Sequence, residues 1–208
     1  MALDYSVYLV TDRDILGDRD LLMAVEQALQ GGVTMLQLRE KTASSRDFYQ
    51  LAVRMKKLAA ACQVPLIIND RLDIALAADA DGLHIGQEDL PPGVARRILG
   101  PGKILGYSVS TVAEAVYGER NGADYLGAGP VYATGSKADA ANPIGIDGLR
   151  QIKQSVSIPV VGIGGIGEVN ILDVKGAGAD GISVISAIMG SRDIRGSSRM
   201  LADAWRQS

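Results

Sequence analysis

Gln37, Arg39 and Lys41 are the residues whose types and spacing first indicate chemistry in this 208-residue chain. They follow an apolar, partly β-branched run that is typical of a strand inside a sheet. Because the side chains of a strand alternate between its two faces, we expect these three on one face and Glu40 on the other. An amide and two cations at the end of one strand suit an anionic ligand. The alternative is a strand end that emerges into solvent.

Two carboxylates, Asp70 and Asp89, stand at the ends of two further predicted strands. Such a pair can share Mg²⁺, a hard cation usually held by a few carboxylates, water and substrate phosphate oxygens. Arg39 and Lys41 end a neighbouring strand, which suits a diphosphate that bridges the metal and these cations. Taken alone, each aspartate is more typical of a helix cap.

A glycine-rich segment at residues 162–166 leads into a predicted helix. Exposed backbone N–H groups at such a turn suit a phosphate, and with the end of the last strand they would form the phosphate site common in barrels. A tight turn that requires glycine is the alternative. The loop at residues 132–143 is too long for a plain connector, so it is a candidate lid. It carries Lys137 either over the site or into solvent.

The chain has one histidine, His84, and one cysteine, Cys62. His84 lies on a short apolar strand, where a hydrogen-bonded core group is more typical than a catalytic base, and one histidine so placed gives no Ser-His-Asp arrangement. Cys62 falls on the apolar stripe of a predicted helix, so we expect it to pack. A single cysteine excludes an intramolecular disulfide and a cysteine-rich zinc site.

Eight predicted strands, each followed by polar residues and then by a helix, position these groups. The strands are expected at residues 5–10, 33–36, 66–68, 83–86, 104–107, 125–131, 158–163 and 182–188. An Ala-Asp pair recurs at Asp81, Asp124 and Asp180, just before three of them, as a repeated strand-helix unit requires. Eight parallel strands with intervening helices close most economically into an α/β fold of the (β/α)8 TIM barrel type, a single domain over residues 1–208. A doubly wound open sheet is the alternative, but no Gly-x-Gly-x-x-Gly opens the first helix.

The net charge of -3 and the isoelectric point near 5.2 argue against a general binder of nucleic acid. The basic cluster is therefore a local site, and the expected partner is a small molecule. No apolar run approaches the roughly eighteen residues that a membrane span needs, and the first residues lack the features of a signal peptide. We expect a cytoplasmic protein without nucleic-acid or membrane partners, and the sequence leaves the formation of a homo-oligomer open.

Seven short motifs are spread in order along nearly the whole chain. They are Tyr8-Leu9-Val10-Thr11-Asp12, Gln37-Leu38-Arg39-Glu40-Lys41, Ile68-Asn69-Asp70-Arg71, His84-Ile85-Gly86-Gln87-Glu88-Asp89, Gly129-Pro130-Val131-Tyr132, Gly162-Ile163-Gly164-Gly165-Ile166 and Ile185-Ser186-Ala187-Ile188. In order and spacing they resemble the thiamin phosphate synthase (thiamine-phosphate pyrophosphorylase) family. The resemblance implies a barrel enzyme of thiamine biosynthesis, a transferase that joins hydroxymethylpyrimidine diphosphate to a thiazole phosphate with Mg²⁺ and releases pyrophosphate.

The resemblance also assigns roles to individual residues. Those implied to bind the pyrimidine diphosphate are Gln37, Arg39, Lys41 and Asn69, and those implied to bind the metal are Asp70 and Asp89. Those implied to hold the thiazole phosphate are Thr134, Ser136, Gly165, Ile185 and Ser186. Lys137 would reach the departing pyrophosphate, and Ser108 would lie near the reacting carbon. The candidate catalytic residues are thus Arg39, Lys41, Ser108 and Lys137.

The chain departs from the family pattern at Ser136-Lys137-Ala138, where the family usually has a second threonine and then Lys-Pro or Lys-Lys. Serine keeps the hydroxyl, so we expect this contact to be retained. The implied mechanism is dissociative, because an aminopyrimidine can delocalise the positive charge left on its exocyclic carbon. The alternatives are a thiazole tautomerase-like relative and a non-catalytic barrel that binds thiamin or phosphate. A complete diphosphate and metal set argues against both.

Overall fold

Short apolar strands alternate with helices along the computed structural model, which describes residues 3–135 and 142–207. The strands are β1 (Val7–Val10), β2 (Met35–Leu38), β3 (Leu66–Asn69), β4 (Gly82–Ile85), β5 (Ile104–Val109), β6 (Tyr125–Ala128), β7 (Val160–Ile163) and β8 (Gly181–Val184). Neighbouring strands are parallel, and β8 also pairs with β1, so the sheet closes in chain order. The predicted (β/α)8 TIM barrel is confirmed.

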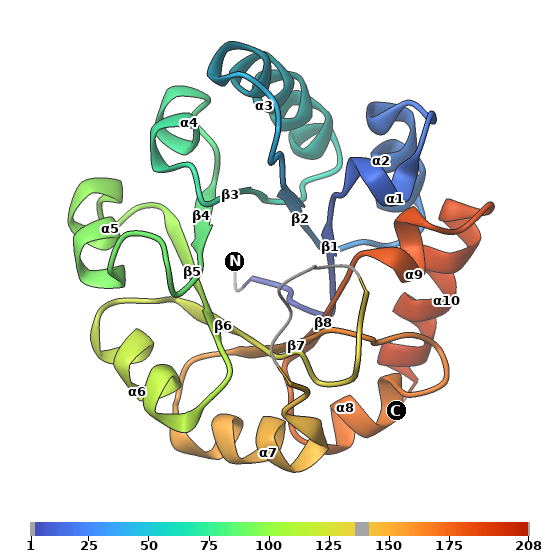
Figure 1. Ribbon diagram of the computed structural model, residues 1–208. Coiled ribbons are helices and arrows are strands. Elements are labelled where there is room, and N and C mark those ends of the chain that lie inside the picture. The colour runs from blue at the N-terminus through green and yellow to red at the C-terminus, as the bar shows by residue number, and fades with distance from the viewer. Residues whose placement is uncertain (1–2, 136–141, 208) are drawn as a thin grey trace.

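The helices form a ring around the strands (Figure 1). They are α1 (Arg13–Leu16), α2 (Leu21–Gln30), α3 (Ser45–Ala61), α4 (Leu72–Ala77), α5 (Pro92–Leu99), α6 (Val112–Arg120), α7 (Gly145–Ser155), α8 (Ile171–Gly176), α9 (Ser186–Met189) and α10 (Ile194–Arg206). Ser44 caps α3, and Thr111 with Glu114 forms the predicted capping box of α6. Such caps pair N–H groups that a helix start leaves unsatisfied. No helix within the described ranges has the length and apolar character needed to cross a membrane.

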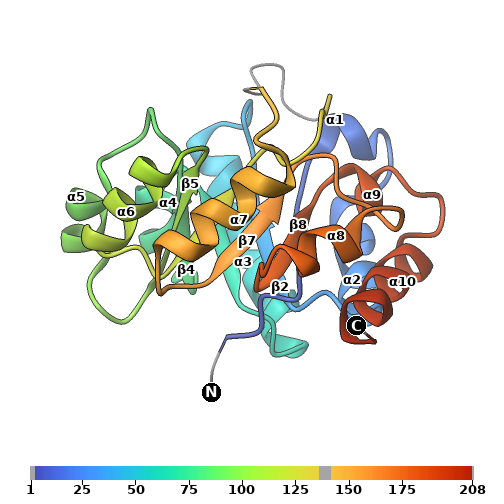
Figure 2. The ribbon, with the colours of Figure 1, turned by 90° about the horizontal axis from the view of Figure 1, so that it is seen from below.

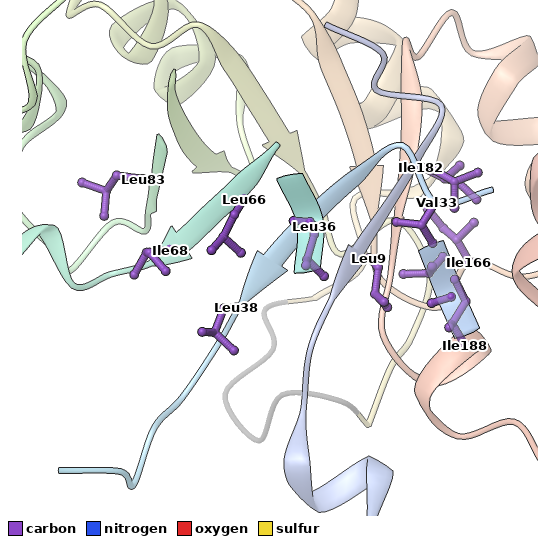
Figure 3. Packing of buried hydrophobic residues seen from close by; sticks show 14 of the residues in the cluster. Leu9, Val33, Leu36, Leu38, Leu66, Ile68, Leu83, Ile166, Ile182 and Ile188 are labelled. Atoms are coloured by element: carbon purple, nitrogen blue, oxygen red, sulfur yellow. The ribbon is translucent and has the colours of Figure 1, made fainter. Parts of the chain in front are cut away.

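Apolar side chains fill two layers. The outer layer packs between strands and helices, and Figure 3 shows Leu36, Leu66 and Ile68 as part of it on β2 and β3. The inner layer lies inside the barrel and contains Tyr5, Tyr8, Met35, Ile67, Tyr125 and Val161. Each strand is therefore buried on both faces, which explains its apolar sequence. The barrel interior is a packed core with a polar end and not a pore.

Three aspartates tie the strands together at the end of the barrel where the strands begin. Asp81, Asp124 and Asp180 each accept a hydrogen bond at 2.7 Å from a backbone N–H at or near the start of the preceding strand. Each also pairs with a basic residue, namely Lys56, Arg96 and Lys153 respectively. The described segment before β1 lies at the end of the barrel opposite α1 (Figure 2). The repeated Ala-Asp pair thus has a structural role away from the carboxyl ends of the strands, where barrels place their chemistry.

Two expectations about the last units of the barrel are wrong in detail. The strand expected at residues 182–188 ends at Val184, because the chain turns at Ile185 into α9. An apolar run alone does not distinguish a strand from a buried helix. The glycine-rich segment 162–166 leads into a loop, and α8 begins only at Ile171.

The expectation that Cys62 packs is also wrong, because this residue is exposed. The apolar stripe of α3 is formed by Phe48, Ala52, Met55 and Ala59. Helical spacing would place Cys62 next on this stripe, but α3 ends at Ala61 and the cysteine occupies the C-cap position. The helix therefore stops before the cysteine can turn inward.

Candidate active site

The carboxyl ends of the strands surround one cavity of about 470 Å³, here called the mouth. The predicted site residues that line it are Arg39, Lys41, Asn69, Asp70, Asp89, Ser108, Thr134, Gly165, Ile185 and Ser186. A smaller cavity of about 20 Å³ shares several of these walls and is also lined by Gln37. Ser136 and Lys137 lie outside the described residues. The structure therefore gathers around two adjoining cavities every predicted site residue that it describes.

The stretch from Gln37 to Lys41 places its alternate side chains as predicted. Gln37 is buried and lines the smaller cavity, while Arg39 and Lys41 line the mouth. Glu40 faces another way, because its carboxylate accepts a hydrogen bond at 2.5 Å from Nε of Arg13 and only 2% of its side chain is exposed. The mouth therefore meets two cations from this stretch, without the carboxylate that lies between them in sequence.

Asp12 holds Arg39 in place, a role that the sequence did not reveal. Nη1 of Arg39 donates to the Asp12 carboxylate at 2.7 Å, and the same carboxylate accepts the N–H of Ile15 at the start of α1. The backbone N–H of Arg39 also donates to the Thr11 hydroxyl at 3.0 Å. Arg39 is thus oriented before any ligand binds, which lowers the cost of ordering its side chain on binding. The only sequence signal was the position of Asp12 at the end of the first strand.

Lys41, Asp70 and Asp89 form a cluster on one wall of the mouth. Nζ of Lys41 donates to the Asp70 carboxylate at 2.6 Å, and Asp89 accepts the backbone N–H of Gly86 at 2.7 Å. Burial, followed by the repulsion of the nearby Asp70 carboxylate, raises the pKa of Asp89. Asp70 also adopts a left-handed backbone conformation with φ of 60°, a strained state that is common at functional sites. Two adjacent carboxylates that repel one another are a fitting place for a cation.

The opposite wall of the mouth is formed by a glycine turn, whose backbone groups face the cavity in place of charged side chains. Gly164 and Gly165 have φ values of 96° and 64°, and a Cβ atom on Gly165 would lie 2.7 Å from the carbonyl oxygen of Ala133. Only glycine suits this conformation and this close approach. Ser186 is exposed beside them at the start of α9. A turn without side chains next to a hydroxyl is suited to hydrogen bonding with phosphate oxygens.

His84 and Ser183 also line both cavities. His84 is the buried, hydrogen-bonded group that the sequence indicated, with its two ring nitrogens 2.9 Å from the Tyr125 hydroxyl and 2.8 Å from the Ser108 hydroxyl. Ser183 received no role from the sequence. Its hydroxyl is buried without a hydrogen-bond partner among residues 3–135 and 142–207. A buried polar group without a partner is costly, so it calls for an explanation in terms of function.

Comparison with known proteins places these features in a family. The family model described as thiamine monophosphate synthase matches residues 7–188. A thiamine-phosphate synthase of Desulfitobacterium hafniense is 60% identical over 206 residues, which is 99% of this chain and 100% of the relative. The thiamine phosphate pyrophosphorylase structure from Pyrococcus furiosus has a TM-score of 0.91 at 40% identity, covering 99% of this chain and 97% of that one. A 3-hexulose-6-phosphate synthase, with a TM-score of 0.74 at 17% identity over 96% and 99% of the two chains, shares the fold alone.

Proposed function

The chain belongs to the thiamine monophosphate synthase family, a family of transferases, and from this premise we propose how its mouth binds and joins two substrates. The reaction is the synthesis of thiamine phosphate from hydroxymethylpyrimidine diphosphate and a thiazole phosphate, with release of pyrophosphate. The observation that carries the proposal is one cavity of about 470 Å³ with cations and paired carboxylates on one wall and a glycine turn on another. Two phosphorylated substrates require such a division.

The diphosphate is proposed to bind where Arg39, Lys41 and Asn69 meet the carboxylates of Asp70 and Asp89. Among the described residues, no group of three or more histidines, cysteines or carboxylates can hold a metal ion. Two carboxylates do fit Mg²⁺, which usually keeps several waters and binds through one or two carboxylates plus substrate phosphates. When bound, Mg²⁺ would neutralise phosphate charge and stabilise the departing anion. The mutual repulsion of Asp70 and Asp89 supports this assignment, because a cation relieves it.

The thiazole phosphate is proposed to bind against the glycine turn. Thr134, Gly165, Ile185 and Ser186 line that part of the mouth, and Ser136 belongs to the same proposed set. Their hydroxyls and backbone N–H groups suit the oxygens of a phosphate monoester. None of the residues just named carries a carboxylate, so none of them repels a second phosphate.

The residues of the mouth support a dissociative transfer. As the bond from the exocyclic carbon to the diphosphate oxygen breaks, negative charge gathers on the departing pyrophosphate, where Arg39 and Lys41 stabilise it and Lys137 joins them. Each well-placed donor contributes about 3 kcal/mol, by analogy with oxyanion sites. The aminopyrimidine spreads the positive charge until the thiazole nitrogen adds to the carbon. No protein nucleophile is required, and Ser108 lies near the reacting carbon.

The direct test is to mix the purified protein with both substrates and Mg²⁺ and to measure thiamine phosphate after its conversion to a fluorescent oxidation product. We expect thiamine phosphate and pyrophosphate in equal amounts. Binding of both substrates without turnover would instead support a non-catalytic thiamin or phosphate-binding barrel. Conversion of a thiazole phosphate into its isomer without coupling would support a tautomerase-like relative.

The Ser183→Ala variant tests whether the unpaired hydroxyl serves the substrate. We propose that the pyrimidine edge faces Gln37 and the smaller cavity, and that it gives Ser183 its missing partner. The variant is expected to be at least as stable as the wild-type protein in thermal unfolding, because it loses a buried group that has no partner. Its KM for the pyrimidine substrate is expected to rise about tenfold through the lost hydrogen bond.

Ser198→Ala is the matched control for this variant. Ser198 is also fully buried, but its hydroxyl donates to the Ile194 carbonyl at 2.8 Å within α10. Its removal is expected to lower stability by about 1 kcal/mol and to leave KM unchanged. Equal destabilisation by the two variants, or an unchanged KM in Ser183→Ala, would contradict a role for Ser183 in binding.

Three broader expectations remain proposals. We propose that residues 1–208 form one domain, that the protein works in the cytoplasm, and that its partners are its small-molecule substrates. A homo-oligomer is compatible with all of these. Size-exclusion chromatography with light scattering measures the oligomeric state directly.

A further inference from the structure

Five side chains form a continuous chain of hydrogen bonds across the barrel interior. Nε2 of Gln37 lies 2.6 Å from the Tyr8 hydroxyl, which lies 2.7 Å from the Tyr125 hydroxyl. The Tyr125 hydroxyl is 2.9 Å from Nδ1 of His84, and Nε2 of His84 is 2.8 Å from Oγ of Ser108. The chain crosses β2, β1, β6, β4 and β5, and both of its ends line the smaller cavity.

The barrel interior is built to hold the middle of this chain. Tyr8 and Tyr125 are fully buried, and their rings meet edge to face with centroids 5.8 Å apart. Gly106 packs directly against this hydrogen-bond chain. A Cβ atom at this position would collide with the Tyr125 hydroxyl and with Nδ1 of His84, so only glycine leaves room for both. Burial raises the pKa of both tyrosines, so both hydroxyls keep their protons. The middle of the hydrogen-bond chain is therefore made of two neutral hydroxyls inside a packed core.

With the Gln37 amide nitrogen placed toward Tyr8, the number of protons sets the direction of the other bonds in this hydrogen-bond chain. The Gln37 amide nitrogen can only donate, so Tyr8 accepts there. If Tyr8 also accepted from Tyr125, its own buried proton would have no partner in the chain, so Tyr8 donates to Tyr125 and Tyr125 donates to Nδ1 of His84. The histidine proton then lies on Nε2 and is donated to Ser108. This tautomer is assigned from the hydrogen-bond network.

The opposite direction is also consistent, but only if both ends change together. With the Gln37 amide turned over, Tyr8 donates to its carbonyl, each bond reverses, and Ser108 donates to His84. In the assigned direction Gln37 keeps its carbonyl oxygen for a ligand and Ser108 keeps its hydroxyl proton for one. A mixed arrangement leaves a tyrosine proton without an acceptor in this hydrogen-bond chain, which is costly in a core.

We propose that this chain couples the Gln37 amide to the Ser108 hydroxyl, and that Tyr8, Tyr125 and His84 are positioning residues for the pyrimidine substrate. The inference rests on the proposed function, in which Gln37 and Ser108 face that substrate. In the assigned direction the site presents an acceptor at Gln37 and a donor at Ser108. It therefore favours a ring that carries an amino group toward Gln37 and disfavours an analogue with an oxo group there.

Nuclear magnetic resonance can determine the direction of the hydrogen-bond chain from the tautomer of the His84 imidazole. The signal is unambiguous because His84 is the only histidine. Untagged protein labelled with ¹⁵N-histidine is expected to show one neutral imidazole with its proton on Nε2. Tyr125→Phe removes the donor to Nδ1 and is expected to give a mixture of tautomers. Tyr5→Phe is the matched control, because Tyr5 packs against Tyr125 with ring centroids 5.3 Å apart but is not a member of the chain. A proton on Nδ1 in the wild-type protein would overturn the assigned direction.

Kinetics test whether the chain positions Ser108. Tyr125→Phe is expected to lower kcat/KM for the pyrimidine substrate about tenfold and Tyr5→Phe less than about twofold. In a Ser108→Ala background, Tyr125→Phe is expected to cost less than about twofold, because its effect passes through Ser108. Additive losses, or equal losses in the two phenylalanine variants, would show a merely structural role. The tautomer measurement needs no turnover, so it stands apart from failure of the proposed function.

Discussion

The Lys41→Ala variant is expected to turn over at least about a hundred times more slowly than the wild-type protein while it remains folded. Lys41 lies at the mouth with 53% of its side chain exposed, and its ion pair with Asp70 spans 2.6 Å. Exposed ion pairs contribute little to stability, so the loss should appear in kcat and not in the midpoint of thermal unfolding. Steady-state formation of thiamine phosphate and a thermal melt measure the two quantities.

Lys153→Ala is the control for Lys41→Ala. Lys153 forms an ion pair with Asp180 at 2.7 Å. Asp180 is one of the three aspartates that tie the strands together at the end of the barrel away from the mouth. Its removal is expected to leave turnover unchanged. Lys41→Arg keeps the charge but not the compact ammonium group, so an intermediate rate is expected. Near-normal turnover of Lys41→Ala would remove Lys41 from the site.

The Arg39→Ala variant is expected to lose as much turnover as Lys41→Ala. Unlike Lys41→Ala, it is also expected to lose stability. Arg39 pairs at 2.7 Å with Asp12, whose side chain is only 7% exposed. Removing the guanidinium leaves a buried carboxylate unpaired, which typically costs about 3–5 kcal/mol. Combining Arg39→Ala with Asp12→Asn removes that charge, so the double variant is expected to regain stability and not turnover. The activity loss and the stability loss can thus be separated.

The sequence predicted those parts of the site that follow from local rules. Alternation along one strand was enough to place Gln37, Arg39 and Lys41 toward the cavities and Glu40 away from them. The rule that parallel strands end on the same side was enough to bring Asp70 near this stretch. Barrel closure also followed from the count of strand-helix units. Each of these inferences uses only neighbouring residues or neighbouring strands.

Contacts across the barrel could not be predicted in the same way. The hydrogen-bond chain that links Gln37 to Ser108 depends on two tyrosines whose sequence positions are typical of ordinary core residues. It also depends on Gly106, which leaves room for them. The sequence indicated that His84 would be hydrogen-bonded, but its partners come from strands that are distant in the chain. The Asp12 and Arg39 pair was hidden for the same reason. Side-chain pairing inside a closed barrel follows from shear and packing, which a single sequence does not display.

The Asp89→Asn variant is expected to be more stable than the wild-type protein in metal-free buffer near neutral pH and to be stabilised much less by Mg²⁺ with pyrophosphate. Burial, and then the Asp70 carboxylate, raises the pKa of Asp89 in the folded protein. The folded state therefore holds this proton more tightly than the unfolded chain. Stability falls as pH rises from the ordinary aspartate range through the raised pKa, so ionised Asp89 destabilises the metal-free protein at higher pH. An asparagine removes the charge and can still accept the N–H of Gly86.

Thermal melts with and without Mg²⁺ and pyrophosphate test this prediction without any turnover. The wild-type protein is expected to gain stability with both ligands, because anything that binds only the folded state raises the melting midpoint. Asp89→Asn and Asp70→Asn should gain much less, whereas Asp147→Asn, an exposed aspartate on α7, should respond like the wild-type protein. The advantage of Asp89→Asn in metal-free buffer should vanish as pH falls into the ordinary aspartate range, where Asp89 itself is neutral. An equal response of all variants to the two ligands would place the metal elsewhere. Full activity in excess chelator would show that the reaction does not need the metal.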